Sequence, residues 1–160
     1  MFFNDSEFLD NIASLVDSFH LPKGFIRFEF NEDDIAQNVA LLGNVIPKIK
    51  QLEISLIADN YTGRYISIDE IKELGFTTIK TSRSLIKDLE KDPTTIAGVK
   101  SIIESINEYG LNYCLVGIEN KLQYQMIREI DEEFVAEGYY FYEPLDLDVL
   151  LDKLRATLIK

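Results

Sequence analysis

Short segments with the hydrophobic pattern of β-strands alternate along this chain with segments of helical periodicity. The strand-like segments are residues 25–30, 53–58, 76–80, 112–118 and 134–137. Between them, apolar residues recur at every third or fourth position, which is the spacing of an amphipathic helix. Such alternation, with little sequence between the elements, requires parallel strands joined by right-handed crossovers. We therefore expect an α/β fold with about five strand–helix units.

A further helix is expected before the first strand. The predicted helices cover residues 8–19, 35–49, 67–74, 92–109, 120–130 and 146–158. Ser67 to Glu70 has the form of a capping box, and Gly75 is expected to end that helix in a left-handed conformation. Gly43 and Pro47 lie inside the second helical pattern, where they predict a kink or an early end.

About five strand–helix units correspond to part of a TIM-type (β/α) barrel. A closed barrel needs eight parallel strands and usually at least about 200 residues, so this sheet is expected to stay open at both edges. Unpaired strand edges invite association. A homodimer, a partner chain or the N-terminal helix could cover them.

The composition limits the partners and the compartment. The 160 residues are 46% hydrophobic, enough for a core, and carry a formal net charge of −12. DNA, RNA and anionic membranes are bound mainly through Lys and Arg, so none of them is expected as a partner. No apolar run approaches the ~20 residues that span a bilayer. The single cysteine, Cys114, rules out an internal disulfide and, with no secretion-signal pattern at the N-terminus, predicts a cytoplasmic location.

Charged residues follow the predicted strands at the points where the strands end. Glu29 and Glu32 end the first strand, Asp59 follows the second, Lys80 ends the third and Glu119 follows the fourth. Parallel strands place their carboxyl ends at one face of the sheet, where α/β proteins bind their ligands. These side chains are therefore expected to meet at one site.

Six short stretches also match a known set of motifs in the same order. They read F-E-F-N-E (28–32), D-N-Y (59–61), K-T-S-R-S-L (80–85), V-G-I-E (116–119), E-G-Y (137–139) and E-P-L (143–145). They resemble E-L/I-T-E, D-D-F-G, K-I-D-R-S-F, A-E-G-V-E and Q-G-Y followed by R-P-L, the motifs of the EAL domain. That family comprises cyclic di-GMP phosphodiesterases and their inactive relatives.

The spacing of these motifs supports the resemblance. No gap is needed from Asp59 to Lys80 or from Lys80 to Val116, and one extra residue precedes Glu137. The resemblance begins near Ser6 and corresponds to the later part of the family's domain. We therefore predict that residues 1–160 form a single EAL-like domain that lacks the first part of the barrel.

The resemblance implies a role for each matching residue. In EAL enzymes two divalent metals activate a water that attacks a phosphodiester. Glu29 and Asp59 match metal ligands, Glu32 matches the glutamate that anchors the loop after the next strand, and Lys80 matches the catalytic lysine. Glu119 and Glu137 fall at ligand-binding positions of the motifs.

Several positions depart from the family pattern. Asn60 replaces an aspartate, Val116 replaces a glutamate and Glu137 replaces a glutamine. The family's namesake segment and its metal-binding asparagine are expected to precede residue 1. Paired metals need several carboxylates to offset their repulsion. Glu29 and Asp59 are therefore expected to hold at most one weakly bound Mg²⁺ or Mn²⁺, and Lys80 is expected to be vestigial.

Each feature also has a simpler structural interpretation. Lys80 could form an ion pair with Asp59, and Glu119 could begin the next helix, where its charge favours the positive end of the helix dipole. The run Tyr139–Tyr142 could stack on a guanine base, but packing is the favoured interpretation. Cys114 is expected to be buried and inert.

Two functions remain open from the sequence. The preferred prediction is a catalytically inactive EAL-like module that regulates or binds another protein, or itself, and requires no cofactor. The alternative is cyclic di-GMP binding, or metal-dependent phosphodiesterase activity completed by a partner or by dimerisation.

Overall fold

The predicted strands form one parallel sheet in the computed structural model of the protein, which describes residues 6–158. The strands are β1 (Arg27–Asn31), β2 (Ser55–Tyr61), β3 (Thr78–Thr81), β4 (Asn112–Val116) and β5 (Ala136–Glu137). They lie side by side in chain order, and every neighbouring pair is parallel. The predicted α/β fold with five parallel strand–helix units is confirmed.

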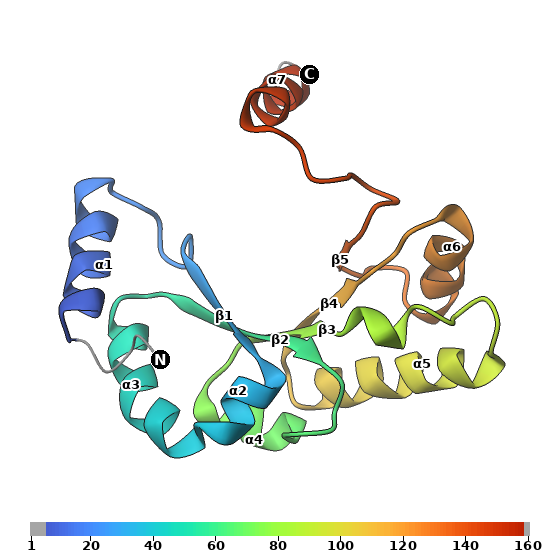
Figure 1. The fold of residues 1–160 in the computed structure, drawn as a ribbon, viewed down its shortest axis with the longest axis horizontal. Helices are drawn as coiled ribbons and strands as arrows, with labels where there is room; N and C mark the ends of the chain where they lie inside the picture. The colour runs from blue at the N-terminus through green and yellow to red at the C-terminus, as the bar shows by residue number, and fades with distance from the viewer. Residues whose placement is uncertain (1–5, 159–160) are drawn as a thin grey trace.

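Helices connect and flank the strands of this sheet. They are α1 (Ser6–Ser18), α2 (Glu32–Gln37), α3 (Val39–Gln51), α4 (Ile68–Leu74), α5 (Pro93–Glu108), α6 (Lys121–Ile130) and α7 (Leu147–Leu158), with a 3₁₀ turn η2 (Arg83–Leu85). Helices α2 to α5 lie below the sheet in Figure 1, while α7 stands apart above it. In the described part of the chain, no helix is long and apolar enough to cross a membrane.

The helix after β1 differs from the prediction. Of the kink or early end expected at Gly43 and Pro47, the early end is wrong, because α3 continues through both residues to Gln51. The interruption falls earlier, at Asn38, which separates α2 from α3 with φ −127° and ψ 24°. The Asn38 side-chain amide donates to the carbonyl of Asp34 at 2.8 Å, so it competes with the backbone for a helical acceptor.

Local capping chemistry was predicted correctly at α4 and α5. The Ser67 hydroxyl accepts a hydrogen bond from the backbone N–H of Glu70, and the Glu70 carboxylate accepts one from Ser67 N–H, as in a capping box. Gly75 ends this helix at φ 98°, a left-handed conformation that glycine adopts without steric cost. Asp92 caps α5 by accepting from Thr94 N–H.

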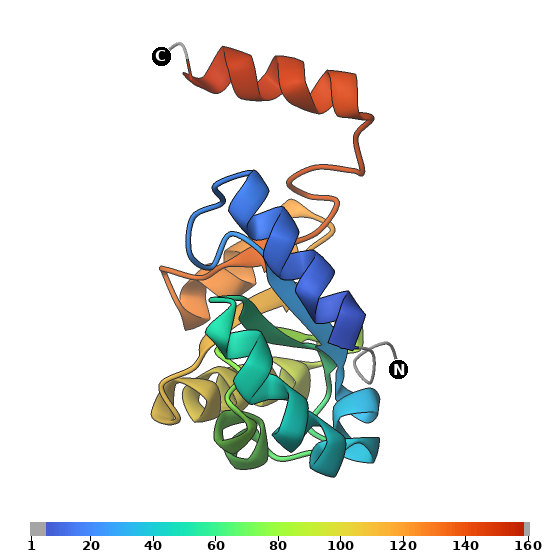
Figure 2. The same cartoon turned by 90° about the vertical axis from the view of Figure 1, so that its left-hand side faces the viewer.

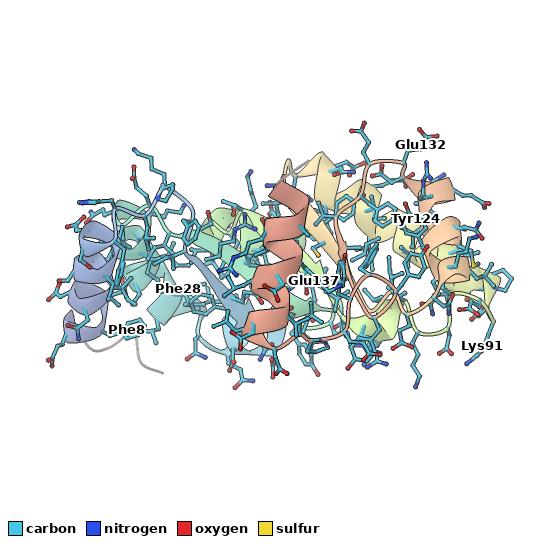
Figure 3. All side chains as sticks on the ribbon, turned by 90° about the horizontal axis from the view of Figure 1, so that it is seen from above. Phe8, Phe28, Lys91, Tyr124, Glu132 and Glu137 are labelled. Atoms are coloured by element: carbon cyan, nitrogen blue, oxygen red, sulfur yellow. The ribbon has the colours of Figure 1, made fainter. Side chains whose placement is uncertain are left out.

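The core lies between the sheet and its helices in two clusters. One gathers around β1 to β3 with α2 to α4, and the other joins β4 to α5 and α6. Tyr113 packs against both clusters from β4. At the β1 side, α1 lies against the first cluster, with the rings of Phe8 and Phe28 6.2 Å apart (Figure 3).

Two strands have bounds that affect the site. β2 extends to Tyr61, so Asp59 lies inside the strand and not after it. Asn60 has φ 55°, and the register with β3 shifts between Ala58 and Tyr61, which marks a bulge. β5 contains only Ala136 and Glu137, half the length predicted.

Candidate functional site

One face of the sheet collects polar residues from every strand. Alternate residues of a strand point to opposite faces, so Glu29, Asp59, Lys80, Cys114 and Glu137 lie on the face opposite the core. The pairing register supports this, because Lys80 lies opposite Cys114 and Val116 lies opposite Glu137. The sheet thus brings residues that are distant in sequence onto one surface.

Lys80 connects the central strand of the sheet to both outer strands. Its ammonium Nζ donates to the two carboxylate oxygens of Glu29 at 3.3 and 3.2 Å, and it lies 3.1 Å from a carboxylate oxygen of Glu137. β1 and β5 are each two strands away from β3, so this ion triad spans the sheet from edge to edge. Seen from above, Glu137 lies near the middle of the molecule (Figure 3).

The environment keeps Lys80 charged. Its side chain is only 13% exposed, and this burial opposes the charge. The hydrogen bonds and charges of Glu137 and Glu29 together outweigh the burial and raise the pKa of Lys80 above its ordinary value. Lys80 pairs with Glu29 and Glu137; the suggested pair with Asp59 is absent from the ion pairs of the described residues.

Cys114 lies beneath this triad and is buried, as predicted. Burial, followed by the charge of Glu137, raises the pKa of the Cys114 thiol to about 11. The thiol is therefore protonated at neutral pH and is a poor nucleophile. The charges that act on it are those of Glu137, Lys80, Glu29 and Asp59, three carboxylates against one ammonium group.

Glu32 holds the loop that follows β2. Glu32 is 1% exposed, and its carboxylate accepts hydrogen bonds from the Thr62 N–H and the Thr62 hydroxyl, both at 2.7 Å. It also accepts from the N–H groups of Arg64 at 2.9 Å and Tyr65 at 3.2 Å.

Burial, with the nearby charge of Glu32, raises the pKa of Tyr61 to about 12.

A cavity of about 420 Å³ opens beside the triad, at the carboxyl ends of β4 and β5. Glu119 lies at its wall and forms an ion pair with Arg83. Arg83 passes over Gly117, where an added Cβ would lie 2.5 Å from the Arg83 Cγ at a φ of 99°. A glycine is therefore required for Arg83 to reach Glu119.

Glu119 is not the first residue of the next helix. Asn120 caps α6 by accepting from the N–H groups of Leu122 and Gln123. The backbone N–H of Glu119 donates to the side chain of the buried Gln123 at 2.8 Å, which fixes the chain just before the helix.

The aromatic run after β5 divides between packing and exposure. Tyr140 and Phe141 pack on Tyr124 of α6, with ring centroids 5.2 and 6.0 Å away. Tyr139 and Tyr142 are more exposed, at 62% and 65% against 37% for Tyr140 and Phe141, and they line the cavity. The packing interpretation therefore holds for two of the four residues.

The residues present do not fit a pair of metal ions. Within the described residues, no group of three or more His, Cys, Asp or Glu side chains is arranged to hold a metal. Both carboxylate oxygens of Glu29 already accept from Lys80, and Asn60 and Val116 supply no carboxylate. Paired cations would lack the anionic oxygens that offset their repulsion.

Sequence reasoning missed Arg83 and Thr81 as parts of this site. Arg83 belongs to the K-T-S-R-S-L stretch, but no role was predicted for it, although it forms an ion pair with Glu119. The Thr81 hydroxyl is buried and accepts from the N–H of Val116 at 3.2 Å, which ties β3 to β4. Their signal was their position within three residues after Lys80, at the carboxyl end of β3, where a parallel sheet places its site.

The fold and site together define a class. An open parallel (β/α) sheet with polar residues at the carboxyl ends of its strands is the architecture of a TIM-like barrel domain with its site at the strand ends. The model of the EAL domain family matches residues 2–144 of this sequence, so the chain belongs to this family.

Individual relatives support the family. The chain is 25% identical over 143 residues to the cyclic di-GMP phosphodiesterase RocR of Pseudomonas aeruginosa, covering 89% of this chain and 36% of RocR. It thus spans about a third of the length of that relative.

Solved EAL structures share the fold. The EAL domain of Mycobacterium smegmatis DcpA superposes with a TM-score of 0.81 at 21% identity, covering 96% of this chain and 67% of that one. The FimX EAL domain from P. aeruginosa, solved bound to cyclic di-GMP, gives 0.80 at 16% identity, covering 89% and 58%. At these identities the likeness extends to the fold alone.

Proposed function

We propose that this chain is a catalytically inactive EAL module that acts by binding another protein or a second copy of itself. The observation that carries the proposal is the ion triad of Lys80 with Glu29 and Glu137. A lysine held by two carboxylates does not offer its charge to a phosphodiester. A carboxylate bonded through both oxygens to lysine is likewise a poor metal ligand.

The charge around the triad supports this proposal. Three carboxylates face one ammonium group near Cys114, so the local field is negative. An anionic substrate would be repelled unless cations were bound first. Any Mg²⁺ or Mn²⁺ at Glu29 and Asp59 would have to displace Lys80, so we propose weak binding at most and no required cofactor.

A hydrolysis assay tests the proposal directly. The purified chain is incubated with cyclic di-GMP in Mg²⁺ and then in Mn²⁺, with RocR as the active control under the same conditions. We expect no linear dinucleotide product above the protein-free blank. Turnover by this chain that depends on added metal would contradict the proposal.

Cyclic di-GMP binding is the second candidate, and the cavity is the observation that favours it. Arg83 and the exposed rings of Tyr139 and Tyr142 are groups that contact phosphate and bases in nucleotide sites. Titration calorimetry with cyclic di-GMP tests it, comparing wild type, R83A and the exposed-lysine control K91A. Binding that R83A abolishes and K91A retains would establish this candidate.

We also propose a cytoplasmic location, on the basis of the single cysteine in the sequence. Fractionation of cells expressing the tagged protein tests it.

A further inference from the structure

The cavity beside the ion triad lies where the chain leaves the sheet for α7. Figures 1 and 2 both show α7 standing apart from the sheet, joined to β5 by the segment 138–146. Part of this segment forms a wall of the cavity. The volume of about 420 Å³ lies near the low end of the range of small-ligand sites, roughly 300–1,000 Å³. The cavity therefore admits a single side chain and not a folded surface.

Carboxylates outnumber cations in the wall of this cavity. Three glutamates line it, Glu119, Glu137 and Glu143, against the single guanidinium of Arg83. Arg83 forms its ion pair with Glu119, so it compensates only that carboxylate. Glu137 has a share of the ammonium of Lys80, which also binds a carboxylate on β1. The wall therefore keeps a net negative charge.

Glu143 is the carboxylate of this wall that has no cation. Its side chain is exposed, and among residues 6–158 it forms no ion pair. The exposed rings of Tyr139 and Tyr142 line the same cavity. A guanidinium group pairs with a carboxylate and stacks on the face of an aromatic ring. The free carboxylate and the two rings are therefore suited to an arginine side chain.

Tyr142 already binds one cation of this chain. The ammonium of Lys153 lies 5.0 Å from the centre of the Tyr142 ring, within the ~6 Å of a cation–π contact. This contact lies toward α7, where Tyr142, Glu143 and Lys153 line a second cavity of about 350 Å³. Tyr142 and Glu143 thus belong to the walls of both cavities. The wall that the two cavities share already holds a basic side chain on its α7 side.

We propose that the cavity beside the triad receives an arginine side chain from a basic segment of another protein. Glu143 pairs with the entering guanidinium, and the ring of Tyr139 stacks on it. The formal charge of −12 attracts a basic partner and repels a second copy of this chain, which carries the same charge. The inference rests on the proposed protein-binding function, and it names the chemistry of the partner and the surface that binds it.

Fluorescence anisotropy of the full chain with a dye-labelled peptide tests this proposal. In the peptide, arginine alternates with glycine. The matched peptide carries citrulline, which keeps the shape of arginine without its charge. At about 0.15 M salt, exposed charges more than about 8 Å apart are largely screened, so the attraction that remains is local. We expect saturable binding of the arginine peptide and no binding of the citrulline peptide.

Variants locate the binding in the cavity. E143Q should weaken binding of the arginine peptide about two- to fivefold, and E108Q, which makes the same charge change at an exposed position of α5, should not. Y139L should also weaken it about two- to fivefold. Its control is Y65L, because Tyr65 is equally exposed, at 62%, and lies outside the cavity. All four side chains are exposed, so the thermal midpoint should not change.

Three results would each overturn the proposal. They are a wild-type chain that does not bind the arginine peptide, equal binding of the citrulline peptide, and effects of E143Q and Y139L no larger than those of their controls. Cyclic di-GMP binding that Y139L weakens, without peptide binding, would assign the cavity to an anionic ligand instead. Hydrolysis of cyclic di-GMP would overturn the inactive role and leave the peptide result unaffected, so the two proposals fail separately.

Discussion

At the scale of single residues, Lys80 has the largest electrostatic effect on the open face of the sheet. Removing its charge in K80A leaves Glu29 and Glu137 facing each other without a cation. We expect the free energy of unfolding to fall by about 1–3 kcal/mol, because the lysine is largely enclosed while its partners are about half exposed. Urea unfolding at neutral pH measures this change.

The control is another lysine with an ion-pair partner. Lys91 lies 3.4 Å from Asp88, but its side chain is 75% exposed, so K91A should cost less than about 0.5 kcal/mol. In the K80A background, E137Q should recover part of the loss, because it removes one of two facing negative charges. Equal effects of K80A and K91A would contradict a stabilising triad.

Glu32 is the residue whose loss should disturb local structure most. E32A leaves the N–H groups of Thr62, Arg64 and Tyr65 without their acceptor. We expect a loss of about 3 kcal/mol or more in the free energy of unfolding, since several charge-assisted hydrogen bonds disappear together. Urea unfolding measures the loss.

Limited proteolysis localises the same effect. Trypsin cleaves after Arg64, which lies in the loop that Glu32 anchors, so E32A should be cut there much faster than wild type. The exposed neighbour Asp33 provides the control, and D33A should be cut at the wild-type rate. An unchanged cleavage rate in E32A would show that the loop is held by other contacts.

At the scale of secondary-structure elements, a hydrogen bond joins β4 to the end of α6. The Tyr113 hydroxyl donates to Asp131, the residue that follows α6. This bond, with a second one from the N–H of Glu133, lowers the pKa of Asp131. Burial, followed by the bond to Asp131, raises the pKa of Tyr113, so the tyrosine remains a donor. The contact is therefore stronger with the ionised aspartate than with the protonated one.

The pH dependence of this contact follows from the lowered pKa. A carboxyl group whose pKa is lower in the folded state stabilises the fold above its unfolded pKa of about 3.9, and this stabilisation disappears as the pH falls through the folded value. Y113F should therefore lower the free energy of unfolding by about 1 kcal/mol at neutral pH, and by a smaller amount at about pH 3. Urea unfolding of wild type and Y113F at both pH values measures these changes. Y109F, which changes the exposed Tyr109, is the control. A difference that grows in acid would contradict it.

At the scale of the whole molecule, the sequence predicted what depends on local chemistry. The order of strands and helices follows from hydrophobic periodicity, and the helix starts at Ser67 and Asp92 follow from capping. The break at Asn38 was missed, because a side chain that competes for a backbone acceptor leaves no hydrophobic signature. The sequence also predicted that Glu29 and Lys80 meet at one site, because parallel strands gather their carboxyl ends. It missed which carboxylates pair with Lys80, because that choice depends on the register of strands whose paired residues are at least 51 positions apart.

The net charge of the whole molecule leads to the last prediction. A formal charge of −12 on 160 residues produces repulsion that opposes the compact state. Raising the salt concentration from about 0.01 M to about 0.3 M shortens the screening length severalfold, and exposed like charges are then screened more than the enclosed Lys80 triad. The thermal midpoint should therefore rise, by roughly 2–4 °C for each kcal/mol of repulsion removed. A midpoint that falls with salt would mean that ion pairs outweigh the repulsion.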